Sequence, residues 1–107
     1  MTNSPLGGAA ASRKLTLTIG ILTLNEADNI KACISSASFA DQVIVVDSGS
    51  TDRTTAIACE QGAQVYRYDD WQGFAVQRNR LLAHATGDYV FFLDADEVIS
   101  PAFREEL

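Results

Sequence analysis

Residues 89–97, Tyr-Val-Phe-Phe-Leu-Asp-Ala-Asp-Glu, contain the sequence feature that decides the fold class. Five apolar or aromatic residues follow a Gly-Asp turn signal without alternating with polar ones, which predicts a short strand buried on both faces. Three carboxylates come directly after this strand: Asp94, Asp96 and Glu97. In an open parallel sheet, ligands bind outside the carboxyl ends of the strands. The stretch therefore predicts a parallel α/β sheet whose functional edge carries these acids.

Three further segments have the composition of strands. Residues 15–22 alternate and are rich in β-branched side chains, residues 43–46 form a Val-Ile-Val-Val run, and residues 64–68 alternate as a more exposed strand. The strand starts are separated by the length of one strand, one helix and two short loops, which predicts right-handed βα units. The expected fold is a Rossmann-like, doubly wound, mainly parallel sheet of about four strands with helices on both faces.

Capping signals predict where the helices begin. Asn25 is expected to cap the helix after the first strand, and Ser50 or Thr51 the helix after the second. A third helix is expected over residues 74–85, and the Ser-Pro pair at 100–101 has the signature of a further helix start.

Composition and charge limit the classes of protein. The chain has 107 residues, of which 47% are apolar, as in an ordinary globular domain. With 14 acidic and 8 basic residues, the net charge of -6 disfavours nucleic acid as a partner.

No apolar run reaches the length of a membrane span. Cys33 and Cys59 lack metal-ligand spacing and are expected to be small buried residues, which suggests a reducing compartment. Because the N-terminus also has no apolar segment after a basic start, a cytoplasmic location is the default prediction. Residues 1–14 are predicted to be a disordered tail.

Polar clusters follow three of the four predicted strands, and we expect them to converge on one ligand. They are residues 23–26 (Thr-Leu-Asn-Glu), 47–52 (Asp-Ser-Gly-Ser-Thr-Asp) and 94–97 (Asp-Ala-Asp-Glu). On an extended backbone Asp94 and Asp96 would point the same way and could share a divalent cation. A plain capping turn rich in Asp and Ser is the alternative interpretation of such clusters. Neither a dinucleotide-binding Gly-x-Gly-x-x-Gly nor a P-loop is present in the sequence.

Four ordered segments together resemble the donor-binding half of the family-2 inverting glycosyltransferases with the GT-A fold. They are residues 23–26, 45–52, 73–79 (Gly-Phe-Ala-Val-Gln-Arg-Asn) and 87–97. The Gln-Arg-Asn segment combined with Asp-Ala-Asp-Glu is similar to the bacterial lipopolysaccharide-core glucosyltransferases. The resemblance implies a nucleotide-sugar-binding domain over residues 15–107, a UDP-sugar or similar donor, and a glycan or glycolipid acceptor in lipopolysaccharide or other cell-envelope glycan synthesis.

The resemblance also implies roles for individual residues. The turn from Thr23 through Asn25 to Glu26 would border the nucleoside. Asp47 would bind the base, and Arg78 would lie near the base or the phosphates. Asp94 would contact the ribose or the metal, and Asp96 would be the main ligand of a Mg²⁺ or Mn²⁺ ion. Independently of the resemblance, Gly49 is expected to let the backbone approach a ligand closely. A hard cation on carboxylate oxygens would stabilise the charge that gathers on a leaving nucleotide diphosphate.

No catalytic base is assigned within the chain. The family's base and acceptor-binding elements follow the Asp-x-Asp segment, so the base is expected beyond Leu107 and this fragment is expected to bind nucleotide without completing transfer. The full-length enzyme could associate peripherally with a membrane. Two alternatives stay open: an aspartyl phosphoryl-transfer enzyme, which also uses Asp-x-Asp after a strand, and a non-catalytic interaction module of the same fold.

Overall fold

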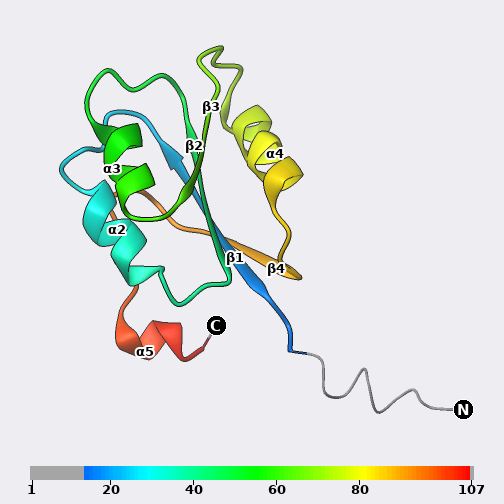
Figure 1. Cartoon of the computed structure of the whole chain (residues 1–107). Coiled ribbons are helices and arrows are strands. Elements are labelled where there is room, and N and C mark those ends of the chain that lie inside the picture. Colours follow the sequence, from blue (N-terminus) through cyan, green and yellow to red (C-terminus); the bar gives the residue numbers. More distant parts are fainter. Residues whose placement is uncertain (1–13, 107) are drawn as a thin grey trace, which may run out of the picture.

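The computed structural model describes residues 14–106 and contains one four-stranded parallel sheet between two layers of helices (Figure 1). The elements follow in the order β1 (Leu17–Thr23), α2 (Ile30–Ser36), β2 (Gln42–Asp47), α3 (Thr54–Glu60), β3 (Gln64–Arg67), α4 (Phe74–His84), β4 (Tyr89–Phe92) and α5 (Pro101–Arg104). The strand order is β3-β2-β1-β4, and all neighbouring strands are parallel. The predicted fold class is confirmed. The tail predicted for residues 1–14 lies outside the described residues, apart from Lys14.

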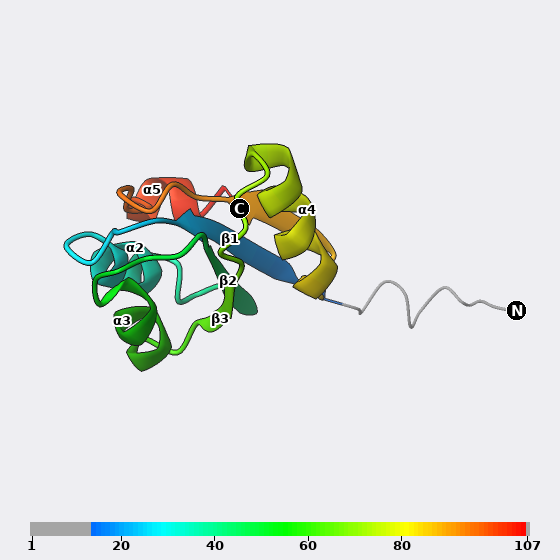
Figure 2. The same cartoon turned by 90° about the horizontal axis from the view of Figure 1, so that it is seen from above.

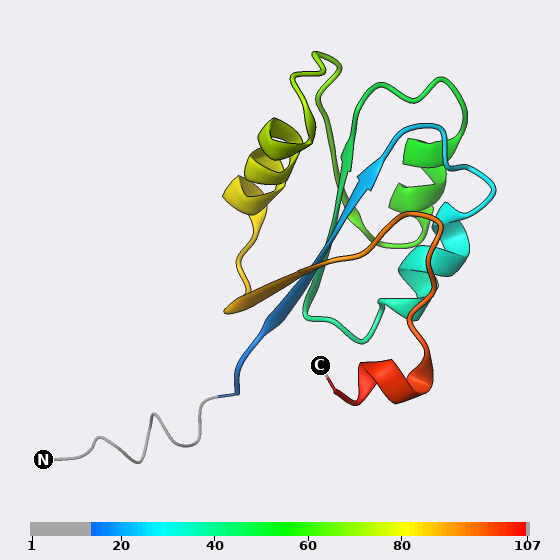
Figure 3. The ribbon, with the colours of Figure 1, turned by 180° about the vertical axis from the view of Figure 1, so that it is seen from behind.

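Side chains alternate along the strands and form one apolar core on each face of the sheet. On one face Ile19 and Ile21 of β1 pack with Val45 of β2 against helices α2 and α3. On the other face Ile44 and Val46 pack against α4. Figures 2 and 3 show α4 on one side of the sheet and α2 and α3 on the opposite side. Both faces of the sheet are therefore covered, as the βα units predict.

Gly20, in the middle of β1, allows α4 to pack closely against the sheet. A Cβ atom at this position would lie 2.6 Å from Cδ2 of Leu81, the buried residue of α4 that covers it. Real Cβ atoms do not approach a carbon atom so closely, so any larger residue would push the helix or its side chain away. The absence of a side chain at Gly20 therefore allows Leu81 and α4 to lie close to the sheet.

Strand β4 differs from the prediction of a strand buried on both faces. It lies at an edge of the sheet that residues 14–106 form, Tyr89 is 60% exposed, and the three following residues are only half-buried. The apolar run was a correct indicator of a strand but a wrong indicator of a central one. Neighbours along the sheet, which a run of five residues does not specify, determine how deeply a strand is buried.

The predicted caps of α2 and α3 are wrong. Asn25 lies before the helix in the left-handed region (φ 53°), and α2 begins at Ile30 instead. Helix α3 begins at Thr54, whose backbone N–H donates to the carboxylate of Asp52 over 2.9 Å. The side chains expected to cap these helices instead connect the two loops to each other, as described below.

The last helix begins as predicted: Ser100 Oγ accepts a hydrogen bond of 3.1 Å from the backbone N–H of Phe103, and Pro101 follows. Both cysteines were expected to be buried. Cys33 is buried as predicted, but Cys59 is exposed on α3, so the prediction for Cys59 is wrong. Within residues 14–106 no helix is long and apolar enough to cross a membrane.

Candidate functional site

Two adjoining hollows lie at the carboxyl ends of β1, β2 and β4. The larger, of about 370 Å³, is lined by Leu22, Thr23, Leu24, Glu26, Ser48, Trp71 and Phe74. The smaller is lined by Leu22, Phe74, Arg78, Phe92, Leu93 and Asp94. Leu22 and Phe74 line both hollows, and we call the two adjoining hollows together the edge groove. Its position agrees with the usual place of ligands in open α/β sheets.

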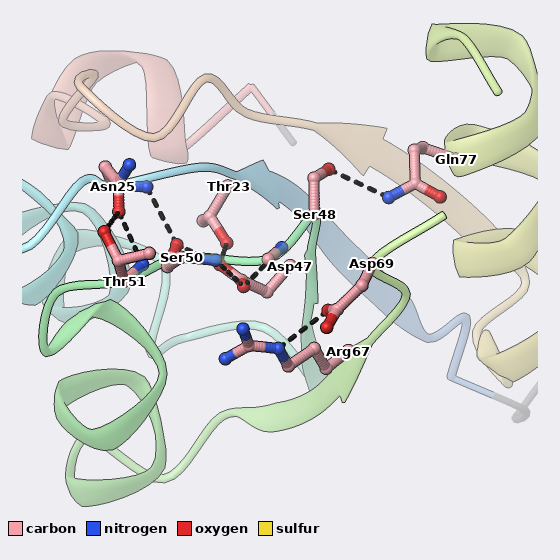
Figure 4. A network of polar contacts seen from close by, with 10 residues as sticks. Thr23, Asn25, Asp47, Ser48, Ser50, Thr51, Arg67, Asp69 and Gln77 are labelled. Atoms are coloured by element: carbon pink, nitrogen blue, oxygen red, sulfur yellow. Dashed lines mark hydrogen bonds and ion pairs between the residues drawn. The ribbon is translucent and has the colours of Figure 1, made fainter. Parts of the chain in front are cut away.

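The carboxylate of Asp47 organises the loop after β2 (Figure 4). One of its oxygens accepts hydrogen bonds from the hydroxyls of Thr23, at 2.7 Å, and Ser50, at 2.5 Å. The other oxygen accepts from the backbone N–H groups of Gly49, at 3.0 Å, and Ser50, at 2.7 Å. Burial raises the pKa of Asp47, but these hydrogen bonds to the charged form outweigh it and leave the pKa below its usual value. Asp47 is therefore a buried anion held by the protein itself.

This geometry separates Asp47 from the groove. Its side chain is fully buried and its two oxygens already have protein donors, whereas the next residue, Ser48, lines the larger hollow. The direct contact between Asp47 and a base stays a prediction, and the structure gives this residue a different task, which is to shape the loop that presents Ser48. Sequence reasoning missed Ser48, although its position directly after a strand end was a usable signal.

Asn25 joins the loops that follow β1 and β2. Its backbone N–H donates to Ser50 Oγ over 2.8 Å, and its side-chain oxygen accepts from the backbone N–H of Thr51, also over 2.8 Å. The neighbouring Glu26 N–H donates to Thr54 Oγ1, again over 2.8 Å. Figure 4 shows the Asn25 contacts beside Asp47. Thr23 and Glu26 line the groove, whereas Asn25 holds the loop that carries them.

Gly49 also acts on loop geometry and does not line the groove. Its φ of 111° lies in a region that residues with a side chain rarely adopt. This conformation lets its N–H reach the carboxylate of Asp47. The predicted close approach of a ligand to Gly49 stays a prediction.

An aromatic pair forms one wall of the larger hollow and was not assigned from the sequence. The rings of Trp71 and Phe74 meet edge to face, with centroids 4.9 Å apart. Both side chains remain accessible, with 51% of Trp71 and 62% of Phe74 exposed. Large exposed aromatic side chains beside a hollow provide an apolar surface on which a planar ring can stack.

The acidic segment after β4 is a turn and not an extended strand end. The backbone N–H of Glu97 donates to the carbonyl oxygen of Asp94 over 2.9 Å, and a Glu97 carboxylate oxygen lies 3.3 Å from the backbone nitrogen of Asp94. The argument that Asp94 and Asp96 point the same way on an extended backbone is therefore wrong. Asp94 lines the groove together with Arg78, whereas Asp96 is exposed and does not line it.

Negative charge nevertheless gathers at this corner of the sheet. The Cys33 thiol of α2 lies under the turn and donates to the carbonyl oxygen of Asp94 over 3.4 Å. Burial, which is the largest cause, and the charges of nearby carboxylates together raise the pKa of Cys33 to about 12. These carboxylates belong to Asp96, Glu97, Glu26 and Asp94. The loop after β1 and the turn after β4 therefore bring their acids to the same region.

This region fits one kind of divalent-cation site. Among residues 14–106 no group of three or more His, Cys, Asp or Glu side chains is arranged to enclose a metal ion. Mg²⁺ commonly uses one or two carboxylates and takes its remaining ligands from water and substrate phosphates. Asp94 lies at the groove and has acidic neighbours in the same turn. This arrangement fits a site that takes most of its ligands from water and phosphates, and does not fit one in which protein side chains alone surround the ion.

Residues 18–107 match the family model described as Glycosyl transferase family 2. The chain belongs to this family. The lipopolysaccharide core biosynthesis glycosyltransferase LpsC of Rhizobium meliloti is 36% identical over 98 residues, which cover 88% of this chain and 36% of LpsC. The glycosyltransferase SunS of Bacillus subtilis is 35% identical over 100 residues, which cover 91% of this chain and 24% of SunS. The chain thus spans about a quarter to a third of the length of these relatives.

Solved structures with the same arrangement include two sugar-phosphoglycerate synthases. The glucosyl-3-phosphoglycerate synthase of Mycobacterium tuberculosis, in complex with Mn²⁺, UDP and glucosyl-3-phosphoglycerate, has a TM-score of 0.70 and 34% identity over 80% of this chain and 35% of its own. The mannosyl-3-phosphoglycerate synthase of Rubrobacter xylanophilus has a TM-score of 0.72 and 31% identity over 81% of this chain and 33% of its own. The family resemblance found in the sequence is confirmed.

Proposed function

We propose that this chain is the part of a glycosyltransferase that binds a nucleotide-diphosphate-sugar donor together with a divalent cation. The observation that carries the proposal is the edge groove, in which an apolar, aromatic hollow adjoins a hollow containing Arg78 and Asp94. A donor nucleotide has the same division into a planar base and a charged diphosphate. The similar synthase of Mycobacterium tuberculosis that binds Mn²⁺ and UDP supports this assignment.

In this proposal the base occupies the larger hollow, against Trp71 and Phe74, with Thr23 and Glu26 at its border. The diphosphate lies in the smaller hollow, where Arg78 offers positive charge. Asp94, with Asp96 as the second proposed ligand, would hold a Mg²⁺ or Mn²⁺ ion beside the diphosphate. A cation placed there neutralises charge on the leaving diphosphate.

The proposal extends to the larger protein. The catalytic base and the acceptor site are proposed to lie outside this chain, because the chain covers only part of its relatives. A role in lipopolysaccharide or other cell-envelope glycan synthesis is supported by the similarity to LpsC. A cytoplasmic location is consistent with two unpaired cysteines. Membership of glycosyl transferase family 2 favours sugar transfer over the phosphoryl-transfer alternative.

Calorimetric titration with UDP, in the presence and absence of Mn²⁺, tests the proposal. The wild-type chain should bind UDP more tightly with Mn²⁺, and Asp94→Asn and Asp96→Asn should lose most of that gain, because a neutral amide is a poorer ligand than a carboxylate. Asp28→Asn, in the loop after β1, is the control for the loss of one negative charge at an exposed position. UDP affinity that does not depend on Mn²⁺ would argue against the cation site, and an unchanged Asp96→Asn would remove that residue from it.

A further inference from the structure

A buried glutamine links the floor of the larger hollow to the charged residues behind it. Gln77 of α4 is fully buried, and its side-chain nitrogen donates to Ser48 Oγ over 2.9 Å, as Figure 4 shows. Its side-chain oxygen accepts a hydrogen bond of 2.7 Å from Nη1 of Arg80. Gln77 itself does not line the groove, so it acts on a ligand only through Ser48.

Arg80 is held in place from two sides. Its guanidinium forms an ion pair of 2.8 Å with Asp70 and lies over the ring of Tyr68, 4.8 Å from the ring centroid. Only 17% of the Arg80 side chain is exposed. A guanidinium carries donors and no acceptor, so it can only face the oxygen end of the Gln77 amide. The orientation of that amide is therefore decided by chemistry, and its NH₂ group must face Ser48.

The direction of this hydrogen bond determines what Ser48 presents to the groove. A hydroxyl that accepts from an amide keeps its own proton for another partner. Within the part of the chain that the structure describes, Ser48 Oγ makes no other hydrogen bond, and Ser48 lines the larger hollow. The hydroxyl proton is thus available to a ligand in that hollow.

We propose that Gln77 and Arg80 are positioning residues for specificity: they set Ser48 as a hydrogen-bond donor to a carbonyl oxygen on the base of the donor nucleotide. This inference rests on the proposed function. The base is the favoured partner because Trp71 and Phe74 offer a stacking wall in the same hollow, whereas Arg78 and Asp94 lie in the other one. A carbonyl-bearing base such as uracil fits a donor that points into an otherwise mostly apolar hollow.

Gln77→Glu is the decisive variant because it reverses the hydrogen bond while keeping the size of the side chain. One carboxylate oxygen keeps the contact with Arg80, and the other accepts the Ser48 proton in a charge-assisted hydrogen bond. Ser48 then no longer donates to the ligand. Gln77→Met is the matched control, since it removes both hydrogen bonds of the amide but leaves the Ser48 proton free. Ser48→Ala removes the donor itself.

Titrations of the full chain with UDP and Mn²⁺ should show affinity on the order of tenfold weaker for Gln77→Glu and Ser48→Ala, and a smaller loss for Gln77→Met. Ser48→Ala should add little in the Gln77→Glu background, because both changes remove the same contact. Inorganic diphosphate with Mn²⁺ should bind all variants equally, since it has no base. Circular dichroism and thermal unfolding establish that each variant is folded.

The outcomes separate the two proposals. If the wild-type chain binds neither UDP nor diphosphate, the proposed function fails. If it binds UDP and the folded Gln77→Glu variant binds UDP equally well, the donor role of Ser48 is refuted. Equal or greater loss in Gln77→Met than in Gln77→Glu would likewise refute it, because a purely structural role for Gln77 predicts that result.

Discussion

Replacing Asp47 tests whether this residue holds the loop after β2, as its hydrogen bonds indicate. In Asp47→Asn the amide oxygen can still accept from the backbone N–H groups of Gly49 and Ser50. The amide nitrogen must then face the hydroxyls of Thr23 and Ser50, which lose their acceptor. Asp47→Ala leaves all these donors without the carboxylate.

The expected magnitudes follow from these contacts. Hydrogen bonds to a charged acceptor contribute about 1.5–3 kcal/mol each and neutral ones about 0.5–1.5 kcal/mol. Exchanging charged for neutral bonds in Asp47→Asn should therefore lower the free energy of unfolding by about 2 kcal/mol. Asp47→Ala leaves the buried backbone N–H of Ser50 and the half-buried N–H of Gly49 without this acceptor, at about 1–3 kcal/mol each, so we expect about 4 kcal/mol.

Urea unfolding at pH 7 and at pH 3 measures how much stability Asp47→Asn loses and whether the charge of the Asp47 carboxylate is the cause. The pKa of Asp47 is lower in the folded state, so its stabilising effect is complete above the unfolded-state pKa and is lost as the pH falls through the folded-state pKa. The difference in stability between the wild type and Asp47→Asn should therefore be large at pH 7 and smaller at pH 3. Other carboxylates titrate in both proteins and cancel in this difference. A difference that is absent at pH 7, or equal at both pH values, would refute the reasoning.

Substitutions at three further positions have expected outcomes. Gly20→Ala should lower the free energy of unfolding by about 1–3 kcal/mol in a urea titration, because its Cβ meets the side chain of Leu81; an unchanged midpoint would contradict this packing. Trp71→Ala should weaken UDP binding by about 1–3 kcal/mol in calorimetry while leaving diphosphate binding unchanged, and equal losses for both ligands would speak against base stacking. Asn25→Ala should destabilise more than Asn25→Gly, because both lose the acceptor for Thr51 but only glycine adopts a positive φ freely; the reverse order would exclude a backbone contribution.

The sequence was sufficient to predict the strands and the edge at which the site lies. The Val-Ile-Val-Val run at 43–46 and the alternation at 15–22 are local patterns, and parallel connectivity brings strand ends to one edge in any such fold. The position of β4 at an edge of the sheet formed by residues 14–106 was not predictable in this way. It depends on which strands pair, and that information is distributed over the whole chain.

The individual groove residues were harder to predict, for a related reason. Asp47 and Ser48 are adjacent in sequence, yet one is buried and the other lines the groove, because Gly49 and Ser50 turn the loop around the Asp47 carboxylate. Gln77 reaches Ser48 from α4, which packs against the sheet at Gly20. Contacts between residues so far apart in sequence have no local signature.

The acidic turn shows a different limit. The pattern Asp-Ala-Asp-Glu correctly indicated charged groups after a strand, but the assumption of an extended backbone failed because the chain closes a turn from Asp94 to Glu97.

The most direct test of the central claim is a nuclear magnetic resonance titration of the isotope-labelled chain with UDP and Mg²⁺, followed by trace Mn²⁺. We expect shifts of the amide signals of Ser48 and Trp71 on addition of UDP, and paramagnetic broadening centred on Asp94 and its turn once Mn²⁺ is present. Signals that stay unchanged at both places, or broadening centred away from the carboxyl edge of the sheet, would contradict the account.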